Sequence, residues 1–237
     1  MQILNLKRFS FAAPKSISLP SPSWPETHKR KAAVAAQTGP LDILAGKRVL
    51  LLADVENLSI SGFDLGRSLC YASLDRLLQQ GSGSISCHAF FSRKADDHKL
   101  VEAFEAISWR AHPRDIQIAR TSRGVETFAN SDHMICFGAG MLVSQKPYDV
   151  VVVATGDGAL GCDLAKAIQQ HGSQGVSILT MSLAGSTSHR LNAVTNPDFD
   201  GNIEIGADCL KHIASGAQQF RFVKPSNSAG GQNAFAW

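Results

Sequence analysis

Long apolar runs are missing from this 237-residue sequence. A membrane-spanning helix needs at least ~18 apolar residues, whereas the longest runs here, near Val49 and Val150, have the length of strands. We therefore expect no membrane partner. The first residues also lack the continuous apolar segment of a secretory signal. This favours a cytoplasmic location, although an organellar transit peptide stays open because no acidic residue precedes Glu26.

Paired cysteines and the common nucleotide-binding motifs are also missing. The five cysteines are far apart and form no CxxC pair, which argues against a zinc site and favours reduced, buried thiols. No GxSxG elbow and no P-loop occurs. Gly138-Ala139-Gly140 does not begin a GxGxxG turn, because Val143 holds the third glycine's place. These absences count against serine hydrolases and dinucleotide-binding proteins.

Basic residues gather near the start of the chain. Residues 1–47 carry seven Lys and Arg against two Asp and Glu, although the net charge of the whole chain is only +3. This segment is suited to binding a polyanion or to being a solvated tail. Its Pro and Ser content predicts a flexible tail over 1–45, a folded domain over 46–215 and a second tail over 216–237.

Between the predicted tails, short apolar runs alternate with segments of helical periodicity. Strand-like runs cover 48–53, 85–91, 116–119, 150–154 and 176–183, and helix-like segments cover 65–78, 100–109, 132–143 and 159–170. Such alternation is typical of βαβ crossovers and of a parallel sheet that helices cover on both faces. We therefore expect an α/β fold, a three-layer α/β/α sandwich with a mainly parallel sheet.

Three aspartates stand where the predicted strands and helices meet. Asp54 ends the first strand with Asn57 three residues later, Asp157 follows the valine-rich strand, and Asp132 precedes a helix. Each acid alone is equally well explained as a turn residue or a helix cap. Together, at the carboxyl edge of one sheet, they would repel one another unless a cation neutralised them. Mg²⁺ or Mn²⁺ with such ligands supports metal-assisted phosphodiester hydrolysis.

Three segments resemble a known family, the NYN domain, a PIN-like ribonuclease fold that includes the LabA-like (DUF88) proteins. They are residues 52–58 (LADVENL), 130–132 (NSD) and 152–158 (VVATGDG), and the resemblance spans about 48–213. It implies a Mg²⁺- or Mn²⁺-dependent endoribonuclease that acts on single-stranded or structured RNA. By this resemblance, Asp54, Asp132 and Asp157 are metal ligands and, with Asn57, form the catalytic set.

The sequence departs from the family pattern at two positions. Ala159 stands where members commonly have a second acid after Asp157, and Gly138 stands where another acid often follows Asp132; Asp163 is the nearest substitute. A noncatalytic RNA-binding or regulatory module with a depleted metal site is therefore the alternative. A phosphotransferase is disfavoured because Glu56 replaces the second aspartate of an Asp-x-Asp pair.

Basic side chains near the strand ends are further candidates. They are predicted to contact RNA phosphates, or else to be solvated loop charges. The sequence leaves open whether the chain forms a homo-oligomer. We also expect Asp54 to face solvent, so that Asp54→Asn should remove cleavage and leave folding intact. The candidate substrate-binding residues are Arg93, Lys94, Arg120, Arg123 and Arg190.

Overall fold

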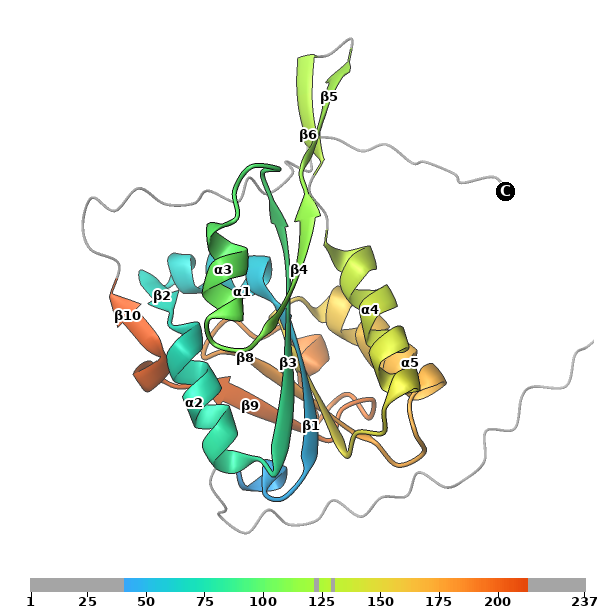
Figure 1. Ribbon diagram of the computed structural model, residues 1–237. Helices are drawn as coiled ribbons and strands as arrows, with labels where there is room; N and C mark the ends of the chain where they lie inside the picture. Colours follow the sequence, from blue (N-terminus) through green and yellow to red (C-terminus); the bar gives the residue numbers. More distant parts are fainter. Residues whose placement is uncertain (1–40, 122–123, 129–130, 213–237) are drawn as a thin grey trace, which may run out of the picture. The chain divides into compact units, whose positions relative to one another are not determined.

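The computed structural model describes residues 41–121, 124–128 and 131–212. Its centre is a six-stranded, fully parallel sheet with the strand order β4-β3-β1-β7-β8-β9 (Figure 1). The strands are β1 (Arg48–Asp54), β3 (Ser84–Arg93), β4 (Arg110–Asp115), β7 (Val150–Ala154), β8 (Ser177–Leu183) and β9 (Gly201–Ile205). The strand order reverses beside β1 and β7, the place where open parallel sheets bind ligands.

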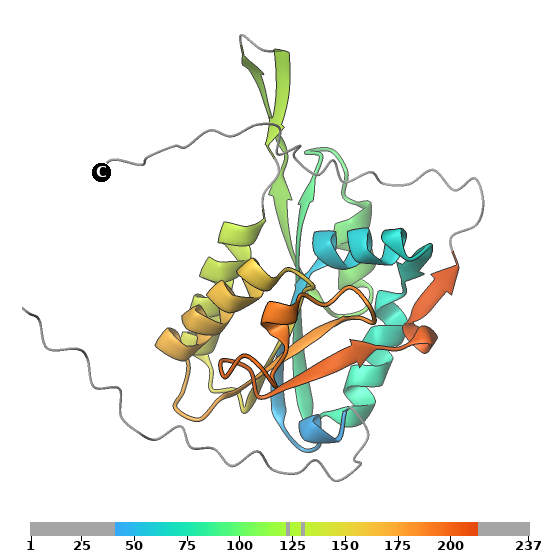
Figure 2. The ribbon, with the colours of Figure 1, turned by 180° about the vertical axis from the view of Figure 1, so that it is seen from behind.

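Helices cover both faces of this sheet (Figures 1 and 2). Side chains of β1 alternate between two buried clusters: Val49 and Leu51 join one, and Leu50 and Leu52 the other. The first cluster includes residues of α1 (Val55–Asp64), α2 (Tyr71–Gly81) and α3 (Lys99–Glu105), and the second includes residues of α4 (Asp132–Gln145) and α5 (Gly158–His171). The predicted three-layer α/β/α sandwich is confirmed.

Two small antiparallel pairs complete the domain. β2 (Arg67–Leu69) pairs with β10 (Leu210–His212), and β5 (Gln117–Thr121) pairs with β6 (Gly124–Phe128) in a hairpin that extends beyond the sheet (Figure 1). Single turns of 3-10 helix lie at η1 (Asp42–Leu44), η2 (His189–Leu191) and η3 (Ala207–Cys209). Leu44, inside the range predicted as a tail, is fully buried. Residues 1–40 and 213–237, which include most of the first predicted tail and all of the second, lie outside the described residues.

The predicted helix over 65–78 is wrong in its first part. Gly66 has a φ of +67°, a left-handed conformation that breaks the helix, and β2 follows it before α2 begins. The predicted helix over 100–109 ends at Glu105, because Ser108, also at positive φ, turns the chain into β4. The edge strands β4 and β9 had no counterpart in the expectations from sequence.

Candidate functional site

The predicted motif segments meet at the carboxyl ends of β1 and β7, the two central strands. Thr155 follows β7, and its Oγ1 donates a hydrogen bond of 3.1 Å to Asp54 Oδ2. The backbone N–H of Gly156 donates to Asn57 Oδ1 at 2.6 Å. Asp54 also caps α1, since its Oδ1 accepts from the backbone N–H of Asn57 at 3.2 Å. Side chains therefore join the first motif segment to the last.

Asp54 is buried, with 5% of its surface exposed. Burial raises the pKa of its carboxyl group to about 7, and the negative charges of Glu56 and Asp132 add to the rise. The hydrogen bonds from Asn57 and Thr155 oppose it. The expectation that Asp54 faces solvent is thus wrong, because neighbouring strands and the segments that follow them cover the carboxylate.

Glu56 is a site residue that the analysis of the sequence did not assign. It lies in the first turn of α1, and its Oε1 accepts a hydrogen bond of 2.6 Å from the backbone N–H of Ser92 at the end of β3. Its Oε2 accepts from the hydroxyl of Ser131 at 3.5 Å. Ser131 is the residue before α4, so Glu56 connects the first motif segment to the second. The acidic residue two places after Asp54 was the signal that could have indicated it.

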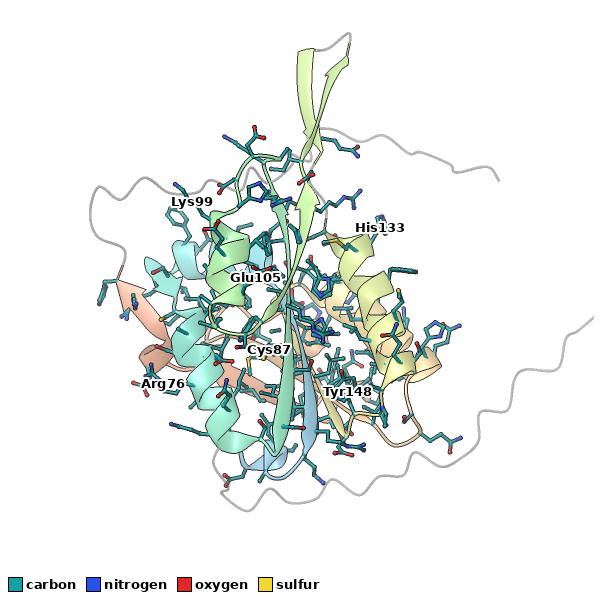
Figure 3. The ribbon with its side chains drawn as sticks, in the orientation of Figure 1. Arg76, Cys87, Lys99, Glu105, His133 and Tyr148 are labelled. Carbon is teal, nitrogen blue, oxygen red and sulfur yellow. The ribbon has the colours of Figure 1, made fainter. Side chains whose placement is uncertain are left out.

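Asp132 opens α4 and is exposed to solvent. The adjacent His133, labelled in Figure 3, marks this helix start at the carboxyl edge, while Tyr148 lies toward the opposite edge. Ser131 is buried beneath this helix start and tied to Glu56. Asp132 is close enough to Asp54 for its charge to raise the pKa of that carboxyl group. Two of the predicted acids, Asp54 and Asp132, therefore lie close enough to interact electrostatically.

Asp157 has a second role as the cap of α5. Its Oδ1 accepts hydrogen bonds from the backbone N–H groups of Ala159 at 2.7 Å and Leu160 at 3.3 Å, and its own N–H donates to Thr155 Oγ1 at 3.2 Å. The side chain is exposed. Asp157 therefore shares Thr155 with Asp54, and the capping interpretation that the sequence left open is confirmed for both aspartates.

The fit of these residues to a metal ion is partial. Among the residues that the structure describes, no three Asp, Glu, His or Cys side chains are close enough to hold an ion together. They form no three-carboxylate cage. Mg²⁺, however, usually keeps several waters and is held by one or two carboxylates and substrate phosphates. Asp54 and Asp132 are compatible with such a hydrated ion.

The two positions that depart from the family pattern differ in the space around them. A Cβ atom on Gly138 would lie 2.9 Å from the ring of Phe90, so α4 packs too closely on β3 to admit an acidic side chain there. Ala159 is exposed in the first turn of α5, beside Asp157. An acidic side chain at position 159 would have room, whereas one at position 138 would have to displace the buried ring of Phe90.

The basic candidates whose side chains are described are Arg93, Lys94 and Arg190. Arg93 ends β3, and its Nε donates to Asp115 Oδ1 at 3.0 Å while its Nη1 lies 2.8 Å from His98 Nδ1. Lys94 follows it and is exposed, as is Arg190 in η2. Arg120 lies within β5 rather than after a strand, and Arg123 falls outside the described residues.

The loop after β8 brings Arg190 next to the last motif segment. The backbone N–H of Ser188 donates to the carbonyl of Gly156 at 3.2 Å. A Cβ atom on Gly156 would lie 2.7 Å from the carbonyl oxygen of Ser186, so only glycine permits this approach. Arg190 therefore borders the carboxyl edge, where a cation can contact a bound phosphate.

Comparisons with known proteins identify the fold and no family. No protein-family model matches the chain, and no curated protein matches it. The crystal structure of VPA0982, a protein of unknown function from Vibrio parahaemolyticus RIMD 2210633, is similar with a TM-score of 0.57 and 16% sequence identity. The similarity covers 70% of this chain and 97% of that one. Within the described residues, no helix is long and apolar enough to cross a membrane.

Proposed function

We propose that this protein is a Mg²⁺- or Mn²⁺-dependent endoribonuclease whose active site lies at the carboxyl ends of β1 and β7. One observation carries the proposal: hydrogen bonds join all three motif segments at this edge. Asp54 binds Thr155, Asn57 binds Gly156, and Glu56 binds Ser131. Contacts within one segment would explain a helix cap, but they do not explain why three distant segments converge around a buried carboxylate.

Asp54 and Asp132 are the proposed ion ligands. When bound, the ion would activate a water molecule and stabilise the leaving oxyanion of a phosphodiester. Asn57 and Thr155 hold Asp54 in place, and Glu56 holds the start of α4, which carries Asp132. Asp157 caps α5 through its Oδ1, and its side chain is exposed to solvent. We assign two exposed cations, Arg190 and Lys94, to contacts with substrate phosphates.

RNA is proposed as the substrate because the motif segments resemble the NYN domain. The basic segment over 1–47 would add attraction for the polyanion that does not depend on its sequence. Weaker binding at higher salt is the expected sign of this contribution.

A noncatalytic RNA-binding module is the second candidate, and two observations favour it. Asp157 uses one oxygen to cap α5, and the described residues hold no group of three metal-ligating side chains. Such a protein would keep the interlocked edge as a scaffold. It would bind RNA in chelator as tightly as in Mg²⁺.

A cleavage assay with matched variants separates the two candidates. Purified protein is incubated with mixed-sequence single-stranded RNA in Mg²⁺, Mn²⁺ or chelator, beside Asp54→Asn and Asp132→Asn. Asp64→Asn is the control, because Asp64 is an exposed aspartate at the far end of α1. Metal-dependent cleavage that only the first two variants lose is the expected result. RNA binding without cleavage in either metal would establish the noncatalytic function.

A further inference from the structure

The small sheet of β2 and β10 brings two cysteines opposite each other. Leu69 pairs with Leu210, and Ser68 pairs with Lys211, in an antiparallel register. The same register, continued by one residue, places Cys70 opposite Cys209. The backbone N–H of Cys70 donates to the carbonyl of Cys209 at 2.7 Å, which holds the two residues side by side just beyond the paired strands, while the N–H of Cys209 donates to Gly206 within the turn of η3.

This placement suits a covalent bond between the two sulfur atoms. The adjoining pair Leu69 and Leu210 is directly opposed in antiparallel strands, where Cα atoms are about 4.5–5.5 Å apart. The hydrogen bond from Cys70 to Cys209 keeps the next two residues similarly close, and disulfides join Cα atoms about 4.4–6.8 Å apart. Neither residue is bonded to another cysteine in the structure.

The two thiols differ in environment in the way that a reactive and a resolving cysteine do. Cys70 is partly exposed immediately before α2, and the hydroxyl of Ser73 donates to its Sγ at 3.3 Å. Hydrogen bonds from the side chain and the backbone of Ser73, together with the nearby Lys211, lower the pKa of the Cys70 thiol. Cys209 is 1% exposed, and burial raises the pKa of its thiol.

We propose that Cys70 and Cys209 are a peroxide-sensitive pair that closes a disulfide between β2 and β10. The Cys70 thiolate attacks one oxygen of hydrogen peroxide, forming a sulfenic acid and releasing hydroxide. The Cys209 sulfur then attacks the Cys70 sulfur, its proton leaves with the displaced hydroxide as water, and the S–S bond forms. The two thiols together supply the two electrons that reduce the peroxide.

The disulfide would fasten the end of the described domain to the segment between α1 and α2. Cys70 and Cys209 are far apart in the sequence, so the link would close a long loop in the unfolded chain and stabilise the folded state. This pair serves as a modification site that does not depend on the ribonuclease activity proposed above. A protein that cleaves no RNA would still form the bond.

Peptide mapping of the full-length protein tests the proposal directly. The protein is treated with hydrogen peroxide, alkylated with iodoacetamide and digested with trypsin, which yields peptide 68–76 with Cys70 and peptide 191–211 with Cys209. We expect these peptides to be joined after peroxide and separate after dithiothreitol. Before peroxide, Cys70 should react with iodoacetamide at least about tenfold faster than Cys209, because its thiolate is both favoured and exposed.

Variants identify the order of the two steps. Cys209→Ser should leave Cys70 as a sulfenic acid that dimedone traps, whereas Cys87→Ser, on β3, should still form the link. The mapping of the unaltered protein stands by itself if a variant does not fold. The proposal is overturned if peroxide leaves peptides 68–76 and 191–211 separate, or if another pair such as Cys136 and Cys162 links first.

Discussion

Replacing Asp54 with Asn should stabilise the metal-free protein at neutral and alkaline pH. The pKa of this buried carboxyl group is about 7, against its usual value of 3.8. A group whose pKa is raised by folding costs no stability below the unfolded value, and its cost grows as pH rises toward the folded value. The asparagine side chain would keep the size and hydrogen-bonding shape of the protonated acid but cannot ionise.

The magnitude follows from the size of the shift. A shift of about 3 pKa units at about 1.4 kcal/mol per unit sets a ceiling of about 4 kcal/mol on the gain in unfolding free energy. The gain of Asp54→Asn should be close to zero near pH 4, grow by up to about 1.4 kcal/mol per pH unit, and level off above pH 7. Acids that do not interact with Asp54 titrate in both proteins and cancel in the difference, whereas Glu56 and Asp132, whose charges act on Asp54, contribute to it.

Urea unfolding in chelator at several pH values, followed by tryptophan fluorescence, measures this difference. Trp109 is a suitable probe because it is buried beside α3. Asp64→Asn should track the unaltered protein at every pH. Adding Mn²⁺ at pH 8, at a hundredfold excess over the dissociation constant, should stabilise the unaltered protein by about 2.7 kcal/mol. The same addition should leave the stability of Asp54→Asn unchanged. A difference that is independent of pH, or an Asp54→Asn variant that is less stable at pH 8, would refute the reasoning.

Four further predictions concern neighbours of this carboxylate and His88, a buried histidine of β3 that pairs with Leu52 of β1. Thr155→Val removes the hydroxyl that donates to Asp54, so the pKa of Asp54 should rise and the lower limb of the pH–cleavage profile should move to higher pH, whereas Thr155→Ser should leave it unchanged. Glu56→Gln removes a negative charge that raises the pKa of Asp54, so that pKa should fall. In urea unfolding with chelator present, the destabilisation caused by Asp54 should then level off at a lower pH. Ala159→Asp adds an acid with room beside the site, and isothermal titration should show tighter Mn²⁺ binding than in the unaltered protein. His88→Phe should remove the part of the pH dependence between 6.5 and 4 that comes from His88, because burial lowers the pKa of His88 to about 4 and the fold disfavours its charged form. Urea unfolding should show the variant gaining stability over the unaltered protein as pH falls, with a part left that comes from His112, whose pKa is lowered as well.

The architecture could be predicted because the two central strands are apolar without interruption over residues 49–53 and 150–154. Residues 150–154 are four valines and an alanine, and the strand lies where the pattern places it. β4 carries Arg110, His112 and Pro113 instead, since an edge strand has fewer neighbours to exclude water. Its sequence contains no apolar alternation, so periodicity could not indicate it. The β2 strand was missed because three residues between two helices are too few to establish a period.

The positions of the site residues could be predicted, but not their burial. Asp54 and Asp157 both follow an apolar strand and precede a helix, and both cap that helix. Asp54 is the last residue of its strand, with the neighbouring β3 pairing as far as Phe90 beside it. Asp157 stands three residues beyond Ala154, at the exposed start of α5. The difference depends on how far each neighbouring strand extends, which local sequence does not state.

Burial of Asp54 and burial of His88 have opposite effects on stability between about pH 4 and 7. As pH rises from about 4 to 7, Asp54 ionises at growing cost, whereas His88 loses a proton that the fold disfavours. The first effect lowers the unfolding free energy and the second raises it. A nearly flat stability profile of the unaltered protein is therefore compatible with both shifts. Only the differences produced by Asp54→Asn and His88→Phe, with slopes of opposite sign, separate the two contributions.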